Sequence, residues 1–279
     1  LAFARDYFLT NPEANRSMQP IYIIEIGAGA AKLCYVMLQK LISLREFWPK
    51  RANGAPVFKY VLTDSTSTSF DFFNNHPSLK PHFESGLLDM AKFDAELDQF
   101  LTLEKSNIVL RHDFLEHPVV MVANYVFDSL RQDAFRVTKD GKIEEVLATV
   151  TAITAPIELI ISREPELLKY IRCTWKAKPI KDICLYYDED EECGAVVEEM
   201  RYMCEQRHNV GFASLKSGRE VNSFDPPKNQ LPGRSGEGSG SSFLLPVGTF
   251  AAMRNVKNLA KNGRMLVIAG DKVGAHPAF

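Results

Sequence analysis

The fold is decided by Ile21-Tyr22-Ile23-Ile24-Glu25-Ile26-Gly27-Ala28-Gly29, a short stretch near the start of the chain. Its first six residues are almost all apolar and largely β-branched, which is typical of a strand that is buried on both faces. The run ends in a turn that contains two glycines, and residues Ala30 to Phe47 follow with helical periodicity. We therefore predict a strand, a tight turn and a helix, which together open a βαβ unit.

Four further stretches resemble buried strands, and helical patterns separate them. The expected strands are Phe58 to Asp64, Pro81 to Leu88, Val119 to Ala123 and Arg264 to Ala269. The expected helices are Ala2 to Leu9, Ser69 to Asn74, Asp94 to Leu103 and Phe250 to Ala260. Strands that alternate with helices predict an α/β protein with a Rossmann-like, doubly wound and mostly parallel sheet, in the strand order 3-2-1-4-5.

The regular alternation stops after the fourth strand. Ala134 to Val137 and Ile143 to Thr151 flank Lys139-Asp140-Gly141, which predicts a β-hairpin because Asp-Gly tolerates a positive φ at a tight turn. The region beyond contains a helical pattern, an acidic run and a Gly/Ser-rich loop, at Glu164 to Ile171, Asp188 to Glu192 and Pro232 to Ser242. We expect a core domain at 1–135, an inserted hairpin and lid at 136–245, and a return to the core at 246–279.

The expected fifth strand is followed by about ten residues, too few to add a further antiparallel pair of strands to the sheet. We therefore expect the edge beyond this strand to be missing or to be filled by the hairpin, and the natural chain to be longer at its C-terminus.

Composition limits the partners of the protein. In 279 residues, 33 Lys and Arg nearly balance 35 Asp and Glu, so no chain-wide positive field favours nucleic acid. The apolar runs are too short to cross a bilayer, so no membrane segment is expected. Five cysteines form no CxxC pair, which favours a reducing compartment. We expect a cytoplasmic protein, with a mitochondrial location as the alternative, while the oligomeric state is left open.

The glycine turn suits either a dinucleotide or S-adenosylmethionine, because both bring a ligand close to the backbone. A dinucleotide fingerprint has a third glycine where this chain has Lys32, which counts against NAD. Glu25 lies in an otherwise apolar strand end and is costly to bury without a partner. S-adenosylmethionine carries an ammonium and a sulfonium, so we expect it to be bound by Glu25, Gly27, Ala28 and Gly29.

Two carboxylates are further candidates for binding the cofactor. Asp64 ends the second expected strand, where it would accept hydrogen bonds from the ribose hydroxyls; the alternative is that it caps the following helix. Asp89 follows the third expected strand, where it would accept from the adenine amino group while Leu88 or Met90 packs on the ring. A plain loop aspartate is the alternative for Asp89.

The fourth expected strand ends in a polar stretch that contains Asn124, Tyr125 and Asp128. Ligands of doubly wound sheets lie beyond the carboxyl ends of the strands, so these side chains would face the transferred methyl group. The alternative is the start of a helix with Asn124 or Asp128 as its cap. We expect no metal site, because the acidic run has no His or Cys at ligand spacing.

Two motifs resemble a known family. Glu25-x-Gly27-x-Gly29, followed by Val122-Ala123-Asn124-x-x-Phe127-Asp128-x-Leu130, is similar to the MidA-like class I methyltransferases. Trp175-Lys176-Ala177-Lys178-Pro179 and Phe243 to Gly248 are similar to a less characterised branch of that family. The resemblance implies a Rossmann-like fold, bound S-adenosylmethionine and methylation of a protein side chain. Tyr125 departs from the family, which usually has Glu there, so a side chain suited to holding a guanidinium is missing.

Three functions are therefore weighed. The first is an S-adenosylmethionine-dependent methyltransferase in which Asn124, Tyr125 and Asp128 orient the acceptor. The second is a non-catalytic binding or assembly protein that retains the fold, since a fold does not guarantee activity. The third, an NAD-dependent oxidoreductase, is weakened by the missing third glycine.

Overall fold

The structure is a computed structural model that describes residues 1–51, 53–152, 170–187, 190–209 and 241–271, without the side chains of 152, 184 and 206–209. The chain divides into two compact units. Unit 1 comprises 1–131 and the described residues from 246 onward, and unit 2 comprises the described residues of 132–245. The domain boundary that was expected from the sequence, between residues 135 and 136, would fall inside strand β7, Asp133–Val137.

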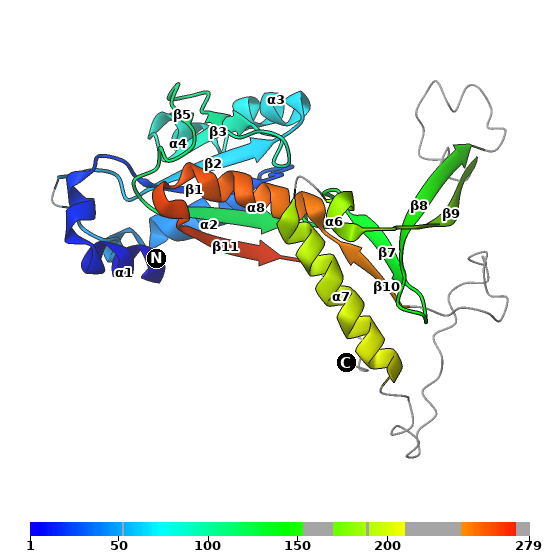
Figure 1. Ribbon diagram of the computed structural model, residues 1–279. Coiled ribbons are helices and arrows are strands. Elements are labelled where there is room, and N and C mark those ends of the chain that lie inside the picture. Colours follow the sequence, from blue (N-terminus) through cyan, green and yellow to red (C-terminus); the bar gives the residue numbers. More distant parts are fainter. Residues whose placement is uncertain (52, 153–169, 188–189, 210–240, 272–279) are drawn as a thin grey trace, which may run out of the picture. The chain divides into compact units, whose positions relative to one another are not determined.

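Unit 1 is built on a five-stranded parallel sheet (Figure 1). Its strands lie in the order β11-β6-β1-β2-β3. Their bounds are β1 Ile21–Ile26, β2 Phe58–Asp64, β3 Leu88–Lys92, β6 Val119–Asn124 and β11 Met265–Gly270. Numbered along the chain, this is the order 3-2-1-4-5, so the expected Rossmann-like class is confirmed.

Both faces of this sheet are covered. Helices α1 (Ala2–Thr10), α2 (Lys32–Ser43) and α3 (Ser67–Asn75) pack on one face, where Cys34, Leu38 and Phe73 are fully buried. Helix α8 (Val247–Leu259) and the small hairpin β4 (Leu101–Thr102) and β5 (Val109–Leu110) pack on the other. Burial on both faces explains why the sequences of β1 and β6 are continuous apolar runs.

Short helices connect these elements. They are the 3-10 turns Pro12–Arg16, Arg45–Phe47 and Lys261–Gly263, together with helix α4, Lys80–Glu84.

Two expectations about unit 1 are wrong. Pro81 to Leu88 was expected to be the third strand, but α4 occupies its first half and β3 begins only at Leu88. Pro81 lies in the first turn of α4, where a missing N–H costs nothing. Asp94 to Leu103 was expected to be helical, but it forms turns that lead into β4.

Unit 2 contains a four-stranded antiparallel sheet in the order β10-β7-β8-β9. Its strands are β7, β8 (Ile143–Ala152), β9 (Ile171–Pro179) and β10 (Ser241–Leu245), and helices α6 (Ile183–Tyr186) and α7 (Glu191–Asn209) follow β9. The expected hairpin is confirmed, because β7 pairs with β8 across a turn in which Gly141 has a φ of 76°.

The hairpin does not fill the edge of the core sheet. It belongs to the sheet of unit 2, so that part of the expectation is wrong. Beyond β11, no strand of the described residues is paired, and Ile268 on β11 is 45% exposed.

Other expectations about the insertion fall largely outside the described residues. Of the expected helix Glu164 to Ile171 only the end is described, and Ile171 begins a strand. Of the Gly/Ser-rich loop only its last residues are described, and they begin β10; the acidic run leads into α7 at Glu191. Among the helices that the structure describes, none combines the length and the apolar character that crossing a membrane requires.

Candidate active site

The turn after β1 has a backbone conformation that requires glycine. Gly27 and Gly29 have φ values of 61° and 51°, in the left-handed region that L side chains rarely adopt. A Cβ at Gly27 would lie 2.9 Å from Cγ2 of Val126, which follows β6. The N–H of Ala28 donates to the carbonyl of Thr63, 2.9 Å away. The turn is therefore fixed against the ends of two neighbouring strands, while Gly27 and Gly29 stay exposed.

Glu25 lies in the core one residue before the end of β1. Only 3% of it is exposed, and its Oε2 accepts a hydrogen bond of 2.9 Å from the hydroxyl of Tyr60 on β2. Burial raises the pKa of Glu25 to about 7, although the bond from Tyr60 acts in the opposite direction. The carboxyl group is therefore partly protonated near neutral pH, and a nearby cation would favour its charged form.

Asp64 ends β2 and joins two loops. Its Oδ1 accepts from the N–H of Thr66 at 2.9 Å and from the Thr66 hydroxyl at 2.7 Å, and its Oδ2 accepts from the N–H of Gly29 at 3.3 Å. Partial burial disfavours the charge, but these hydrogen bonds outweigh burial and lower the pKa of Asp64. The cap position of α3 belongs to Thr66, so Asp64 is not the helix cap that was the alternative.

Leu88 was expected to end the third strand and Asp89 to follow it, but both lie at the start of β3, so this expected location is wrong. Asp89 pairs with Val61, three residues before Asp64, which separates it by roughly 10 Å from the carboxyl edge of the sheet. Both residues are fully buried. An adenine at the carboxyl edge would therefore lie away from them.

The Asp89 carboxylate has a structural network instead. It accepts from the N–H of Met90 and of Lys105 at 2.9 Å, and from the N–H and the hydroxyl of Ser106 at 3.2 and 2.7 Å. The ammonium of Lys59 lies 3.3 Å from Oδ2. Burial disfavours the charge, but these hydrogen bonds and Lys59 outweigh it and lower the pKa of Asp89.

The residues that follow β3 are Phe93, Asp94 and Glu96, none of which the sequence singled out. The N–H of Phe93 donates to the carbonyl of Asp64 at 3.0 Å, so this loop starts beside the end of β2. Oδ1 of Asp94 accepts from the N–H of Glu96 at 3.0 Å, which closes a turn. With the strand correctly placed, the Asp-Ala-Glu pattern would have identified Asp94 as the carboxylate at this edge.

Asn124 is the last residue of β6, and the loop that follows, with Tyr125 and Asp128, is a turn rather than a helix. The alternative in which Asn124 or Asp128 caps a helix is therefore wrong. Tyr125 has a φ of 53°, and half of it is exposed. Its N–H donates to the carbonyl of Gly270 at 2.9 Å, and a Cβ at Gly270 would lie 2.9 Å from Oδ1 of Asn124. A non-glycine residue at a positive φ is uncommon and often marks a functional position.

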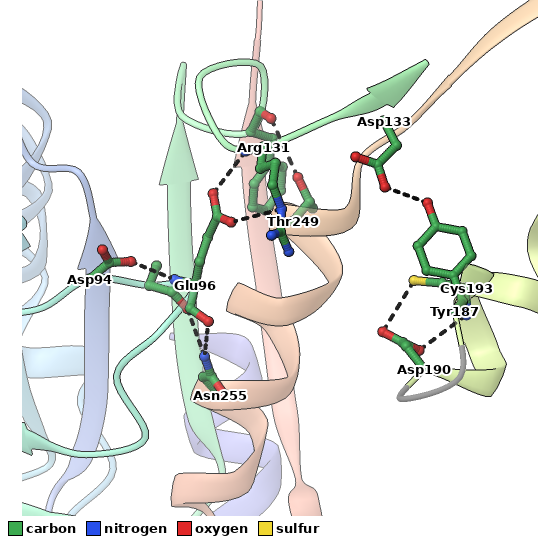
Figure 2. A network of polar contacts seen from close by, with 11 residues as sticks. Asp94, Glu96, Arg131, Asp133, Tyr187, Asp190, Cys193, Thr249 and Asn255 are labelled. Carbon is green, nitrogen blue, oxygen red and sulfur yellow. Dashed lines mark hydrogen bonds and ion pairs between the residues drawn. The ribbon is translucent and has the colours of Figure 1, made fainter. Parts of the chain in front are cut away.

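Glu96 connects the loops after β3 and β6 (Figure 2). Its Oε1 accepts from the N–H of Arg131 at 2.8 Å, and Asn255 on α8 donates to the carbonyls of Ala95 and Glu96 at 2.9 and 3.1 Å. A Cβ at Gly248 would come within 2.6 Å of the Arg131 nitrogen, so the start of α8 packs closely here. These contacts hold both loops in one arrangement at the carboxyl edge.

Together, the carboxyl edge of the sheet carries the glycine turn, Asp64, Asn124, Tyr125 and Asp128, with Glu25 buried beneath the turn. A cavity of about 620 Å³ opens elsewhere, beside Tyr22 at the start of β1, and it contains none of these residues. Within the described ranges, no group of three or more His, Cys, Asp or Glu side chains is arranged to hold a metal ion.

No protein-family model matches the chain, and no curated protein matches it. Among solved structures, it is similar to a COG1565 superfamily member and likely methyl transferase from Burkholderia thailandensis bound to S-adenosyl-homocysteine, with 16% identity and a TM-score of 0.33. That match covers 64% of this chain and 34% of the other.

Two further solved structures are similar. An uncharacterized COG1565 superfamily protein from the same organism has 14% identity and a TM-score of 0.29, over 64% of this chain and 36% of its own. The citrinin polyketide synthase CMeT domain has 17% identity and a TM-score of 0.25, over 41% and 24%. The chain thus spans about a third or less of the length of these proteins. Similarity at this level carries no argument about function, and the fold class rests on the strand order.

Proposed function

We propose that the protein binds S-adenosylmethionine and transfers its methyl group to a protein side chain. The observation that carries the proposal is the hydrogen bond between the N–H of Gly29 and Asp64. It joins the glycine turn after β1 to the carboxylate that ends β2, at the edge where open α/β sheets bind nucleoside ligands. The family resemblance of the two sequence motifs supports the same conclusion.

The chemistry of these residues fits the cofactor. A carboxylate has about four lone-pair positions, and Asp64 uses three of them within the protein. The Ser69 hydroxyl is a further hydrogen-bond partner of this carboxylate. A position for a ribose hydroxyl becomes available if the Thr66 and Ser69 hydroxyls, whose oxygens are 3.0 Å apart, turn toward each other. Glu25 would hold the ligand's ammonium from beneath the turn, where the buried carboxyl group has Tyr60 as its partner.

The residues at the end of β6 and in the following loop would act on the methyl acceptor. When bound, S-adenosylmethionine supplies an activated methyl group, so the protein mainly aligns the acceptor and excludes water. Asn124 is packed against Gly270, and Tyr125 is tied to the same residue through its backbone. We propose that Asn124 and Tyr125 orient the acceptor and that Asp128 accepts its proton.

The proposed acceptor is a protein side chain other than a guanidinium. The family's usual Glu is replaced by Tyr125, whose ring is half exposed and would pack on the stem of an incoming side chain. Arginine is disfavoured because the carboxylate that would pair with its charge is missing at this position.

A transfer assay tests the proposal. The purified chain is incubated with tritiated S-adenosylmethionine and the proteins of a cell extract, and label is counted in the protein fraction. We expect incorporation that Tyr125→Ala lowers about tenfold or more while cofactor affinity is unchanged, because a positioning contact contributes to the transition state. Tyr202→Ala, at an exposed tyrosine on α7, is the matched control. Cofactor binding without any transfer would instead support the binding or assembly protein.

A further inference from the structure

Strands β8 and β9 extend beyond the rest of their sheet as a two-stranded ribbon (Figure 1). β7 pairs with β8 only from Ile143 to Glu145, whereas β9 pairs with it from Glu144 to Ala152. From Val146 onward, the described part of the sheet therefore has two strands. Two-stranded ribbons are marginally stable in water, and a third strand or another covering element stabilises them.

The ribbon has one apolar and one polar face. Residues directly opposite each other in an antiparallel pair share a face, and successive residues alternate between faces. From Val146 onward, the pairs on the first face are apolar: Val146 and Ala177, Ala148 and Trp175, Val150 and Cys173. On the second face they are Glu145 and Lys178, Leu147 and Lys176, Thr149 and Thr174, Thr151 and Arg172. The apolar face is open, with Val150 62% and Trp175 43% exposed.

The outer edge of β9 is basic. The strand order makes β9 an edge strand, and all of its charged residues are cations, namely Arg172, Lys176 and Lys178. All three are exposed, and within the part of the chain that the structure describes none of them forms an ion pair. Among the described strands none pairs with this edge, so it offers backbone hydrogen-bonding groups together with positive charge on one face.

These charges disfavour a second copy of the chain as the covering element. Two β9 edges that pair about a twofold axis centred on Thr174 would set Arg172 opposite Lys176. An axis at Trp175 would set Arg172 opposite Lys178, and one at Lys176 would set that residue opposite itself. Like charges directly opposite each other destabilise a pair of strands, and basic residues on edges are a common barrier to self-association.

We propose that the edge of β9 binds an extended segment of another protein, in which apolar and acidic residues alternate, as an added strand. Its acidic residues, at every second position, lie beside Lys176 and Lys178, and its apolar residues extend the face that contains Trp175. Backbone hydrogen bonds supply the affinity, and the two faces supply the selectivity. This binding surface belongs to unit 2 and is independent of the methyl-transfer proposal.

A labelled peptide of four Val-Glu repeats, blocked at both ends, is the probe, and its fluorescence anisotropy is measured on titration with the full chain. We expect saturable binding that Lys176→Glu combined with Lys178→Glu weakens about tenfold, because two cross-strand attractions become repulsions. Lys40→Glu with Lys50→Glu, at exposed positions of unit 1, changes the net charge equally and should leave the affinity unchanged. Circular dichroism checks that the variants fold.

Further probes separate the proposed partner from other occupants. A peptide of four Val-Lys repeats should not bind, and one with its four Glu residues grouped together should bind at least about fivefold more weakly. No binding of the Val-Glu peptide, or equal loss in both double variants, would overturn the proposal. Two further outcomes would overturn it if the peptide also failed to bind. One is that the β9 double substitution abolishes a dimer seen in sedimentation, and the other is that it releases the chain from phosphatidylserine vesicles.

Discussion

Tyr60 on β2 donates a hydrogen bond of 2.9 Å to Glu25 on the neighbouring strand β1, within the core of unit 1. Both side chains lie on the sheet face that packs against α2, close to the fully buried Cys34. The pair keeps an ionisable group directly beneath the glycine turn. Because burial raises the pKa of Glu25 to about 7, small changes around neutral pH alter the charge at this point.

The first prediction concerns stability. The pKa of Glu25 rises from 4.5 to about 7 on folding, so the folded state holds this proton more tightly than the unfolded state does. The associated stability is present below pH 4.5 and is lost as the pH rises to about 7. Relative to the wild type, Glu25→Gln should therefore become more stable over this range, by up to roughly 3 kcal/mol.

Urea denaturation at several pH values measures this difference, with the exposed Glu46→Gln as the control. Parallel stability curves for Glu25→Gln and the wild type would show that Glu25 ionises normally in the folded protein.

The second prediction concerns Asp64. We expect Asp64→Ala to weaken S-adenosylhomocysteine binding by roughly 1.5 to 3 kcal/mol, the scale of hydrogen bonds to a charged group. Because Thr66 holds the cap position, α3 should survive, at a cost of about 1 kcal/mol for the lost turn bonds. Calorimetry and thermal unfolding measure the two effects, and Asp71→Ala on α3 is the control. Reduced stability with unchanged affinity would limit Asp64 to a structural role.

The third prediction separates two costs at Gly27. Gly27→Ala should destabilise the protein by about 1–3 kcal/mol, because it combines an unfavourable positive φ with a contact of 2.9 Å to Cγ2 of Val126. Val126→Ala removes that atom. In the double variant the steric part of the Gly27→Ala destabilisation should therefore disappear, while the part due to the positive φ should remain. A double-mutant cycle from denaturation midpoints measures the coupling. Strictly additive effects would contradict the contact.

The fourth prediction distinguishes the two carboxylates of neighbouring strands. Asp89→Ala should destabilise the protein by about 3–5 kcal/mol, because Lys59 and several N–H groups lose their partner in the core. Its affinity for S-adenosylhomocysteine, measured where the variant is folded, should be unchanged. An affinity loss comparable to that of Asp64→Ala would return Asp89 to the cofactor site.

The strands that the sequence predicted correctly share one property. β1, β2, β6 and β11 are apolar runs bounded by Gly, Asp or Asn, so local composition alone defines them. β3 was misplaced because Asp89 and Lys92 interrupt its pattern. The Asp89 carboxylate is tolerated in this buried strand because it contacts Lys59 and Ser106. Partners this far away in sequence are not visible in the local pattern.

The candidate site was predictable to the same extent. Glu25, Gly27, Gly29 and Asp64 follow from correctly placed strands, and the structure brings them together around one turn. Asp89 followed the misplaced strand and fell at the wrong end of it. Glu96 was missed because its role depends on hydrogen bonds from Arg131 and Asn255. These two residues are distant from Glu96 in the sequence and reach it only in the folded protein. The partnership between Tyr60 and Glu25 likewise required the register of β1 against β2.

The most direct test is a parallel calorimetric titration of the full chain with S-adenosylhomocysteine and with NAD. We predict saturable, one-to-one heat with S-adenosylhomocysteine, with a Kd on the order of micromolar, no heat with NAD, and a weakened first titration in Asp64→Ala. Absence of S-adenosylhomocysteine binding by the folded chain, or saturable binding of NAD in its place, would contradict the proposed cofactor site.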